Sequence, residues 1–421
     1  MQLVAYGAQD VYLTGNPKVT FFQAVYKRHT NFAMENIEQV VNGSASDSGR
    51  LSVTVARNGD LIGNMYLELT SAAAQTDNVW SAERAVQDVE LTIGGQRIDK
   101  HYQKWWRLYA ELYLDDAKKA EWGKLTSTTA GGQKCVLPLI FFFNRNPGLY
   151  LPLIALQYHE VRLDIDLASD FTSRFSTSVK VWGNYVYLDT EERRRFAQKG
   201  HEYLIEQVQH TGSDTIAAGE NQVRLSYNHP VKELVWCLSD ASAASGVNGG
   251  WAFVNDPTDL TATANIAVMT KTSLTSNVVV EPHKSGAPFL ICNGLAAGSY
   301  LDEKAVTSTA GLVAAGPLSK FKLILNGQDR FKEQDGYYFN QVQPMNHHSG
   351  NPMAGIYSYS FALKPEEHQP TGTCNFSRID NAQVAVTPKT GETAIDQLNM
   401  FAVNYNVLKV QSGMGGLAFS N

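Results

Sequence analysis

Two carboxylates stand two residues apart and could serve as an acid–base pair. Asp164 and Asp166 belong to the segment Arg162-Leu163-Asp164-Ile165-Asp166-Leu167, and general acid–base catalysis commonly uses such groups. In a β-strand alternate residues share a face, so Arg162 and both aspartates lie on one side and the apolar residues on the other. This alternation is typical of a strand with one face in solvent. We interpret the pair as an exposed strand face.

Histidines could bind a metal ion, but their spacing does not favour it. His347 and His348 are adjacent, so on a strand they would point in opposite directions, and the neighbouring Pro344 and Gly350 indicate a loop. His159-Glu160 lacks the second histidine of H-E-x-x-H, and none of the ten histidines forms an H-x-H pair. The sequence predicts no metal and no other cofactor.

A glycine-rich segment near the end imitates a dinucleotide-binding fingerprint. Gly413-Met414-Gly415-Gly416-Leu417-Ala418 matches G-x-G-x-x-A, but that fingerprint needs a following helix to face the pyrophosphate. The chain stops at Asn421, so we predict a flexible, close-packed strap instead. The chain has no G-x-S-x-G elbow and no Walker loop. We predict that the protein is not an enzyme.

The elements that carry these residues are mostly strands. Short apolar or alternating runs stand between turn signals, as in a β-sandwich. The expected strands are 51–55, 65–69, 89–93, 136–143, 161–167, 179–188, 231–238, 321–325, 356–363 and 401–410, with strand-like residues also in 11–26. One helix is expected over 102–119, where Trp105, Trp106, Leu108 and Leu112 form an apolar face.

Length and charge indicate two domains in an oligomer that does not bind nucleic acid. A chain of 421 residues exceeds what one core usually supports. Charged residues make up only 18%, below the roughly 25% of soluble domains, so part of the surface is expected to be covered by other subunits. The net charge of −6 argues against phosphate-backbone binding. The basic run Arg193-Arg194-Arg195 follows two glutamates and is expected to be a solvated linker.

Cysteine usage and targeting signals indicate a reducing compartment. Cys135, Cys237, Cys292 and Cys374 are widely spaced, without a C-x-x-C pair. No signal peptide opens the chain, and no segment has the ~18 apolar residues of a membrane span. Free thiols in the cytoplasm are the simplest expectation.

Three short segments of the first half of the chain recur in similar form in the second half, and these sequence echoes suggest that the same fold occurs twice. The first is Arg50-Leu51-Ser52 with Arg224-Leu225-Ser226, and the second is 91–96 (LTIGGQ) with 323–328 (LILNGQ). The third is 184–188 (NYVYL) with 404–408 (NYNVL). Each is weak alone, but they occur in the same order. Two similar domains on one chain suit lattice assembly better than catalysis.

The two halves differ in one long loop. Ser52 and Gly95 are 43 positions apart, whereas Ser226 and Gly327 are 101 apart, so the second half carries 58 extra residues. They fall within about 239–319, which is rich in Ala, Ser, Thr and Gly. Added length is tolerated best where nothing packs. We expect this insert on the exterior, with Trp251 and Phe253 folded down onto its own domain.

Long stretches of the chain resemble one protein family. They are 5–17 (AYGAQDVYLTGNP), 93–102 (IGGQRIDKHY), 152–161 (PLIALQYHEV), 195–198 (RFAQ), 325–331 (LNGQDRF), 360–365 (SFALKP), 372–381 (GTCNFSRIDN) and 404–418. These segments are similar to the major capsid proteins of large icosahedral DNA viruses of eukaryotes, most closely those of algal viruses (phycodnaviruses, chlorovirus-like). The similarity covers almost the whole chain and fails mainly in 71–85 and in the insert.

The resemblance implies an all-β fold of two consecutive eight-stranded antiparallel jelly rolls, with short helices in the connecting loops. We expect an N-terminal arm (1–20), a first jelly roll (21–198) and a second jelly roll (199–421) with the exterior insert. Three chains would form a pseudo-hexagonal capsomer, and capsomers an icosahedral shell over an internal membrane. The implied partners are two further copies, neighbouring capsomers, and minor capsid and penton proteins. Contact with the membrane would be indirect, with no direct nucleic-acid contact. The implied location is the virion, after assembly in the host cytoplasm.

A carbohydrate-binding jelly roll is the alternative function. Trp251, Asn248 and Asp256 lie close together in the insert and could contact a host glycan. For modification of the chain itself, Asn42 in Asn42-Gly43-Ser44 is the glycosylation candidate, because it lies in an expected loop. The second sequon, Asn375-Phe376-Ser377, is strand-like and expected to be inaccessible.

Overall fold

The computed structural model describes residues 7–72, 80–128, 131–239, 316–352, 355–389 and 397–419, together with the backbone of two short strands at 278–280 and 290–292. Within these residues strands predominate and all strand pairs are antiparallel. The all-β prediction is therefore confirmed. Trp251, Phe253, Asn248 and Asp256 lie outside the described residues.

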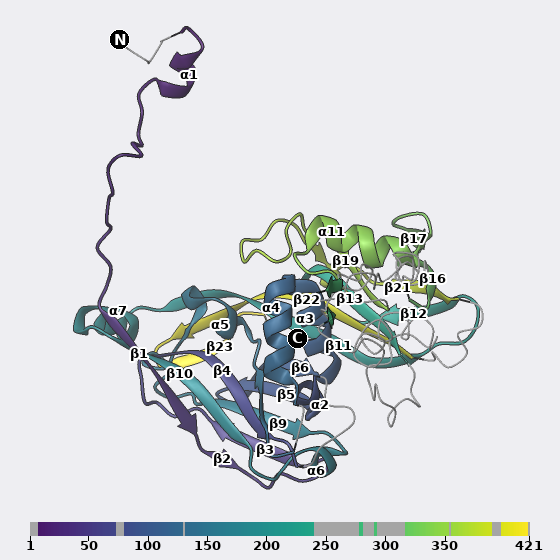
Figure 1. Cartoon of the computed structure of the whole chain (residues 1–421), viewed down its shortest axis with the longest axis horizontal. Helices are drawn as coiled ribbons and strands as arrows, with labels where there is room; N and C mark the ends of the chain where they lie inside the picture. The colour runs from purple at the N-terminus through teal and green to yellow at the C-terminus, as the bar shows by residue number, and fades with distance from the viewer. Residues whose placement is uncertain are drawn as a thin grey trace.

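The first half folds as two facing sheets (Figure 1). One sheet has the order β1 (Phe32–Gln39), β10 (Lys180–Leu188), β4 (Leu61–Thr70) and β7 (Lys134–Pro138), and β8 (Leu151–Pro152) also pairs with β4. The other has the order β2 (Val41–Asn42), β3 (Arg50–Thr54), β9 (Val161–Leu167), β5 (Val86–Ile93) and β6 (Gln96–Tyr102). The helices are α2 (Ser81–Arg84), α3 (Gln103–Tyr113), α4 (Asp116–Thr126), α5 (Phe142–Arg145), α6 (Phe171–Arg174) and the 3-10 turn η1 (Pro147–Leu149).

The second half repeats this arrangement. One sheet has the order β11 (His201–Thr215), β22 (Gln397–Gln411), β13 (Pro230–Ser239) and β19 (Ile356–Ser360), with β20 (Cys374–Asn375) on β13 and β23 (Met414–Leu417) on β22. The other has the order β12 (Asn221–Leu225), β21 (Ala382–Pro388), β16 (Leu318–Leu325) and β17 (Gln328–Asp329), with β18 (Gln334–Asp335) on β16. The remaining elements are α7 (Thr190–Gln198), η3 (Tyr338–Val342), α11 (Gln343–His347), η4 (Phe376–Arg378) and the pair β14 (Val278–Val280) and β15 (Leu290–Cys292).

Two of the three sequence echoes occupy equivalent places. Leu51 on β3 and Leu225 on β12 are both buried, and β3 pairs with β9 as β12 pairs with β21. The hairpin turns after β5 and β16 also match: Gly94 and Gly95 have φ of 57° and 81°, and Asn326 and Gly327 have 53° and 76°. Positive φ at both central residues is the geometry of a tight hairpin turn that favours Asn-Gly and Gly-Gly.

The third echo lies on equivalent strands but on opposite faces. Tyr185 on β10 points into its own sandwich, where its hydroxyl donates to the Ala56 carbonyl at 2.7 Å. Tyr405 on β22 alternates in step with Phe401 and Val403, which belong to the core of the first half, so it points toward that half. A one-residue offset in a strand reverses the face. The residues that match in the sequences of this third echo therefore do not occupy equivalent positions in the two sheets.

Several local expectations are wrong. Residues 11–26 form no strand; the structure has the short helix α1 (Asp10–Thr14) followed by extended chain. The helix over 102–119 is split because Leu114 is extended and the Asp115 carboxylate caps α4 by accepting from Lys118 N at 2.8 Å. The strand over 136–143 ends at Pro138, and the last of these residues begin α5. The strand over 356–363 likewise ends at Ser360.

The hydrophobic core extends from one half into the other. The larger buried cluster contains the first sandwich and also Val235, Phe401 and Val403 from the second half. The smaller cluster fills the second sandwich, where Trp236 stacks on Phe321 with ring centroids 4.3 Å apart. The sheet that contains β22 and β13 is therefore buried on both faces. No helix in the described part of the chain is long and apolar enough to cross a membrane.

Candidate functional site

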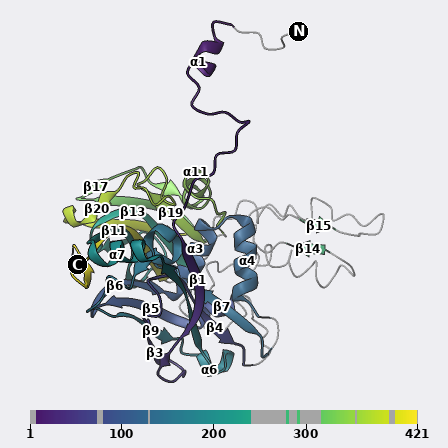
Figure 2. The same cartoon turned by 90° about the vertical axis from the view of Figure 1, so that its left-hand side faces the viewer.

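The N-terminal segment, residues 7–31, extends away from the two sandwiches (Figures 1 and 2). Its apolar side chains are exposed: Tyr12 is 92% accessible and Phe22 99%. The other members of this set are Val11, Leu13, Val19, Phe21, Val25 and Tyr26. Apolar runs of this kind on a protein surface mark contacts with other molecules. The segment is the first candidate assembly element.

The junction between the halves is held by hydrogen bonds along two regions. On one side, β6 lies beside β11, and Val208 N donates to the Asp99 carboxylate at 3.0 Å. On the other side, the end of α3 meets the residues after α11, and Gly350 N donates to the Leu112 carbonyl at 2.9 Å. A Cβ on Gly350 would lie 2.3 Å from the Glu111 carbonyl oxygen, so only glycine fits this approach. The two halves therefore have a fixed relative position.

Buried charges reinforce this junction. Glu206 on β11 pairs with Lys232 of β13 at 2.7 Å and with Arg145 of α5 at 2.8 Å. Burial lowers the pKa of Lys232 to about 8, although Glu206 opposes this effect. Burial acts to raise the pKa of Glu206, but Arg145 and Lys232 outweigh it and lower that pKa. The triad thus links both halves through one carboxylate.

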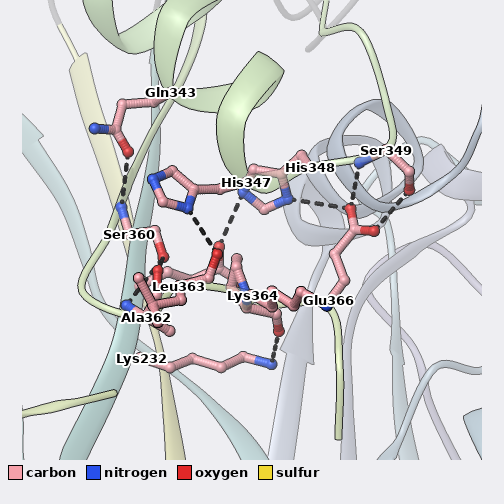
Figure 3. A network of polar contacts seen from close by, with 12 residues as sticks. Lys232, Gln343, His347, His348, Ser349, Ser360, Ala362, Leu363, Lys364 and Glu366 are labelled. Carbon is pink, nitrogen blue, oxygen red and sulfur yellow. Dashed lines mark hydrogen bonds and ion pairs between the residues drawn. The ribbon is translucent and has the colours of Figure 1, made fainter. Parts of the chain in front are cut away.

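His348 lies in a second buried pair beside the end of α3. Its Nε2 is 3.1 Å from Glu233 and its Nδ1 is 3.3 Å from Glu366, which also accepts from Ser349 (Figure 3). Its ring meets Tyr113 edge-on at 5.3 Å. Burial acts to lower the pKa of His348, but Glu233 and Glu366 outweigh it and raise the pKa to about 9. His348 was expected in a loop, and it does follow the end of α11, but its side chain is buried, which the sequence did not predict.

A third buried group of charges lies around α3 and α4. Arg107 pairs with Glu83 at 3.3 Å and with Glu111 at 3.1 Å, and its guanidinium lies 4.0 Å from the Trp80 ring centroid. Lys119 pairs with Glu111 at 3.1 Å and donates to the Asn351 carbonyl at 2.7 Å. Burial raises the pKa of Glu83, although Arg107 opposes it. These ion pairs fix the helices that cover the second half.

The candidate acid–base pair is part of an ion-pair network. Asp164 is only 7% exposed, not open as expected, because Arg162 and Arg50 lie over it at 2.8 and 3.7 Å. Asp166 pairs with Arg50 at 3.5 Å. Alternation along β9 predicted the correct side of the strand for both aspartates. It did not predict that Arg50 and Arg162 would shield Asp164 from solvent. Both aspartates are used in structural ion pairs.

The other sequence candidates also have structural contacts. The strap 413–418 contains β23, which pairs with β22, and His159 lies 2.9 Å from the Gly415 carbonyl. The basic run lies in the exposed helix α7, where Arg193 pairs with Asp60 at 3.0 Å. Cys135, Cys237 and Cys374 are free thiols; the side chain of Cys292 is not described. The described residues contain no group of three potential metal ligands.

The two glycosylation sequons are both on the surface. Asn42 is exposed on β2 and precedes Gly43, whose φ of 114° forms a turn. Asn375 is exposed as well, which contradicts the expected inaccessibility, but its side chain accepts from Ser377 N at 3.0 Å.

A small pocket of about 150 Å³ opens between β6 and β11. Polar residues dominate its lining, including Arg97, Lys100, Gln209 and Thr211. Lys100 pairs with Asp88 at 3.1 Å. The Asp99 carboxylate already accepts a hydrogen bond from Val208 N and lies beside His101 Nε2. The pocket therefore contains no acid–base constellation.

Family models match the two halves separately. Residues 20–189 match the N-terminal part of major capsid proteins, and residues 192–416 match the large eukaryotic DNA virus major capsid protein. The division between the two matches falls at the same place as the division between the two pairs of sheets.

Whole-length relatives carry the same description. The chain is 43% identical to the major capsid protein of Paramecium bursaria Chlorella virus 1, covering 100% of this chain and 99% of the relative. It is 39% identical to that of Phaeocystis pouchetii virus, with the same coverage. The insert and the N-terminal segment thus fall within the span of these alignments.

Solved structures agree in fold. A chain of the quasi-atomic PBCV-1 virus capsid superposes with a TM-score of 0.75 at 38% identity, covering 96% of this chain and 100% of that one. The Faustovirus major capsid protein shares the fold at 12% identity, with a TM-score of 0.66. Two repeated antiparallel sandwiches joined by a rigid junction define a double jelly-roll capsid protein. The chain belongs to the family of large eukaryotic DNA virus major capsid proteins.

Proposed function

We propose that this major capsid protein assembles as homotrimers that form pseudo-hexagonal capsomers. The observation that supports this most strongly is the repeat of one sheet order in two sandwiches with a fixed junction. Three chains would then present six similar edges, so a threefold object could occupy nearly sixfold positions in a lattice. The domain boundaries that we propose are 21–198 and 199–421, after an N-terminal arm of 1–20.

The capsomers would build a large icosahedral shell over an internal membrane. Their partners would be neighbouring capsomers and minor capsid and penton proteins, with indirect membrane contact and no direct contact with nucleic acid. The net charge of −6 supports the last point, because nucleic-acid binding needs a positive surface. Assembly would take place in the host cytoplasm, where the three described thiols stay reduced.

The mass in solution tests the trimer. Three chains of 46.4 kDa give about 139 kDa, and we expect light scattering to find this mass at micromolar concentration. Obligate interfaces bury several thousand Å², so dilution should not release folded monomers easily. A stable, folded monomer at micromolar concentration would contradict the proposal.

We propose the exterior for residues 239–319 and a glycan at Asn42. An antibody against the insert should bind intact particles; binding only to disrupted particles would contradict the exterior position. Mass spectrometry of protein from virions, compared with an Asn42→Gln variant, tests the glycan. No observation on the described residues favours the carbohydrate-binding alternative.

A further inference from the structure

The outer face of the β1-β10-β4-β7 sheet lies open to solvent. On β4 the residues that face the core, Met65, Leu67 and Leu69, are almost fully buried, whereas the alternate residues Tyr66 and Glu68 are only half-buried. The strand pairing places Pro138, Tyr66, Trp182 and Glu38 in one row across all four strands. The face therefore combines aromatic and apolar side chains with a few charges.

Internal contacts already order this open face. Trp182 Nε1 donates to Glu68 at 3.0 Å, and Lys134 pairs with the same carboxylate at 2.6 Å. Asn36 donates to the Tyr66 hydroxyl at 2.5 Å. Because the side chains are already held, little conformational entropy remains to be lost when a partner covers them.

The equivalent face in the second half is covered. On the β11-β22-β13-β19 sheet, Val235, Phe401 and Val403 belong to the core of the first half. α3 and α5 supply the cover: Trp105 lies 5.7 Å from the Phe401 ring, and Arg145 pairs with Glu206. Within one chain, the helices of one sandwich thus cover the sheet of the next.

The second half has counterparts of the covering elements. α3 lies between β6 and β7, and η3 and α11 lie between β18 and β19, the strands at the same places in the second sheets. α5 follows β7, and the loop 361–373 follows β19. These counterparts carry Met345, which is 87% exposed, and Leu363, which is 75% exposed. They lie together, because His347 Nδ1 is 3.1 Å from the Leu363 carbonyl (Figure 3).

We propose that Met345 and Leu363 of one copy pack on the open sheet face of a second copy, around Tyr66, Trp182 and the half-buried Val136, which lies opposite Glu68. The proposal rests on the trimer proposed above and names its contact. It repeats between chains the arrangement that α3 and α5 make within one chain. The contact joins two different surfaces, so it propagates head to tail and closes into a ring at the rotation that three copies supply.

Charge substitutions at the two surfaces test this contact. We expect Val136→Glu and Met345→Glu each to raise at least tenfold the protein concentration at which trimers dissociate. Thr54→Glu, exposed on β3 of the other sheet, is the matched control and should leave that concentration unchanged. Val136→Glu combined with Met345→Lys should recover part of the loss, because opposite charges would then meet. If Val136→Glu fails to fold, Thr70→Lys on the same face replaces it.

Each outcome separates this contact from the trimer itself. A wild-type chain that is monomeric would contradict the proposed function. A wild-type trimer whose face variants remain trimeric at the same concentrations would overturn only this contact. Dissociation of both single variants without recovery in the pair would show that the two surfaces do not meet. Loss of the trimer on removal of residues 7–31, with Met345→Glu unaffected, would assign the face to the N-terminal segment.

Discussion

The two halves build the same four-stranded order twice, and the two copies differ in what lies on their outer faces. In the second half, Val235 and Phe401 are buried under helices of the first half. In the first half, Tyr66 and Trp182 occupy the same side of the corresponding strands and are half-exposed. The fold alone therefore does not decide whether a sheet face is core or surface. What decides it is whether the helices of a preceding sandwich cover that face.

Residue chemistry follows this difference. The covered face carries aliphatic and aromatic residues and a buried ion-pair triad, Arg145, Glu206 and Lys232. The open face carries residues that tolerate water, with a Trp and a Tyr whose polar atoms are bonded. Tyr and Trp suit surfaces that are exposed before assembly and buried after it. The covered face is a permanent interface within the folded chain, whereas the open face would be a conditional interface, one that forms only when chains assemble.

Truncation of one aromatic side chain on each face should show the largest contrast. We expect Phe401→Ala to lower the free energy of unfolding by about 3–5 kcal/mol, because it leaves a cavity at the junction. Trp182→Ala should cost the monomer about 1 kcal/mol or less, since it fills no core. Urea unfolding of both variants in the Met345→Glu background, at a concentration where that background no longer forms trimers, provides the comparison. Equal losses would mean that the open face is already part of a core.

Removal of the shared carboxylate should have the next largest effect. Glu206→Leu leaves Lys232 and Arg145 without their partner, and breaking a buried ion pair costs about 3 kcal/mol. The matched control is Glu202→Leu, four residues earlier on β11, whose pair with Lys409 is exposed and should contribute at most about 0.5 kcal/mol. Thermal unfolding of both variants measures the difference. A similar loss for the two would show that the triad does not stabilise the junction.

The His348 pair should add a pH dependence at the same junction. Its pKa is raised from 6.5 to about 9, so the folded state holds the proton more tightly than the unfolded state. The stabilisation is then fully present below pH 6.5 and lost as pH rises toward 9, with a magnitude of up to about 3 kcal/mol. Lys232, with its pKa lowered to about 8, acts in the opposite direction between pH 8 and 10.5. The effect of His348 on the free energy of unfolding is therefore most clearly measured between pH 6.5 and 8, below the range in which Lys232 acts.

His348→Gln isolates this effect. The stability difference between wild type and variant should be large at pH 6 and should shrink across the window from pH 6.5 to 8. His347→Gln, next to it and only half-buried, should keep the wild-type profile. A pH-independent difference for His348→Gln would mean that Glu233 and Glu366 do not hold the proton on this ring.

Local patterns predicted the strands but not the contacts between distant segments. The strands that contain Leu51 and Leu91 were predicted from local patterns, and both are confirmed as β3 and β5. His348 is buried because Glu233 lies beside it, 115 positions away in the chain, and no local pattern encodes that approach. Residues 11–26 were predicted to contain strands because exposed apolar residues look like core residues in sequence. Exposure itself is a tertiary property.

The N-terminal segment should show the smallest effect on stability and a clear effect on assembly. Residues 7–31 extend from β1, the edge strand of the open sheet, and their apolar side chains are exposed. Deletion of Met1 to Asn16 removes no buried side chain that the structure describes, so the free energy of unfolding should change by less than about 0.5 kcal/mol. We expect the variant to form trimers but to assemble into shells poorly, as seen by electron microscopy. Tyr12→Ser with Leu13→Ser, which keeps the length, should impair assembly in the same direction. Loss of the trimer with unfolded sandwiches would show instead that the segment belongs to the core of the protein, and the difference between permanent and conditional interfaces would then not extend to it.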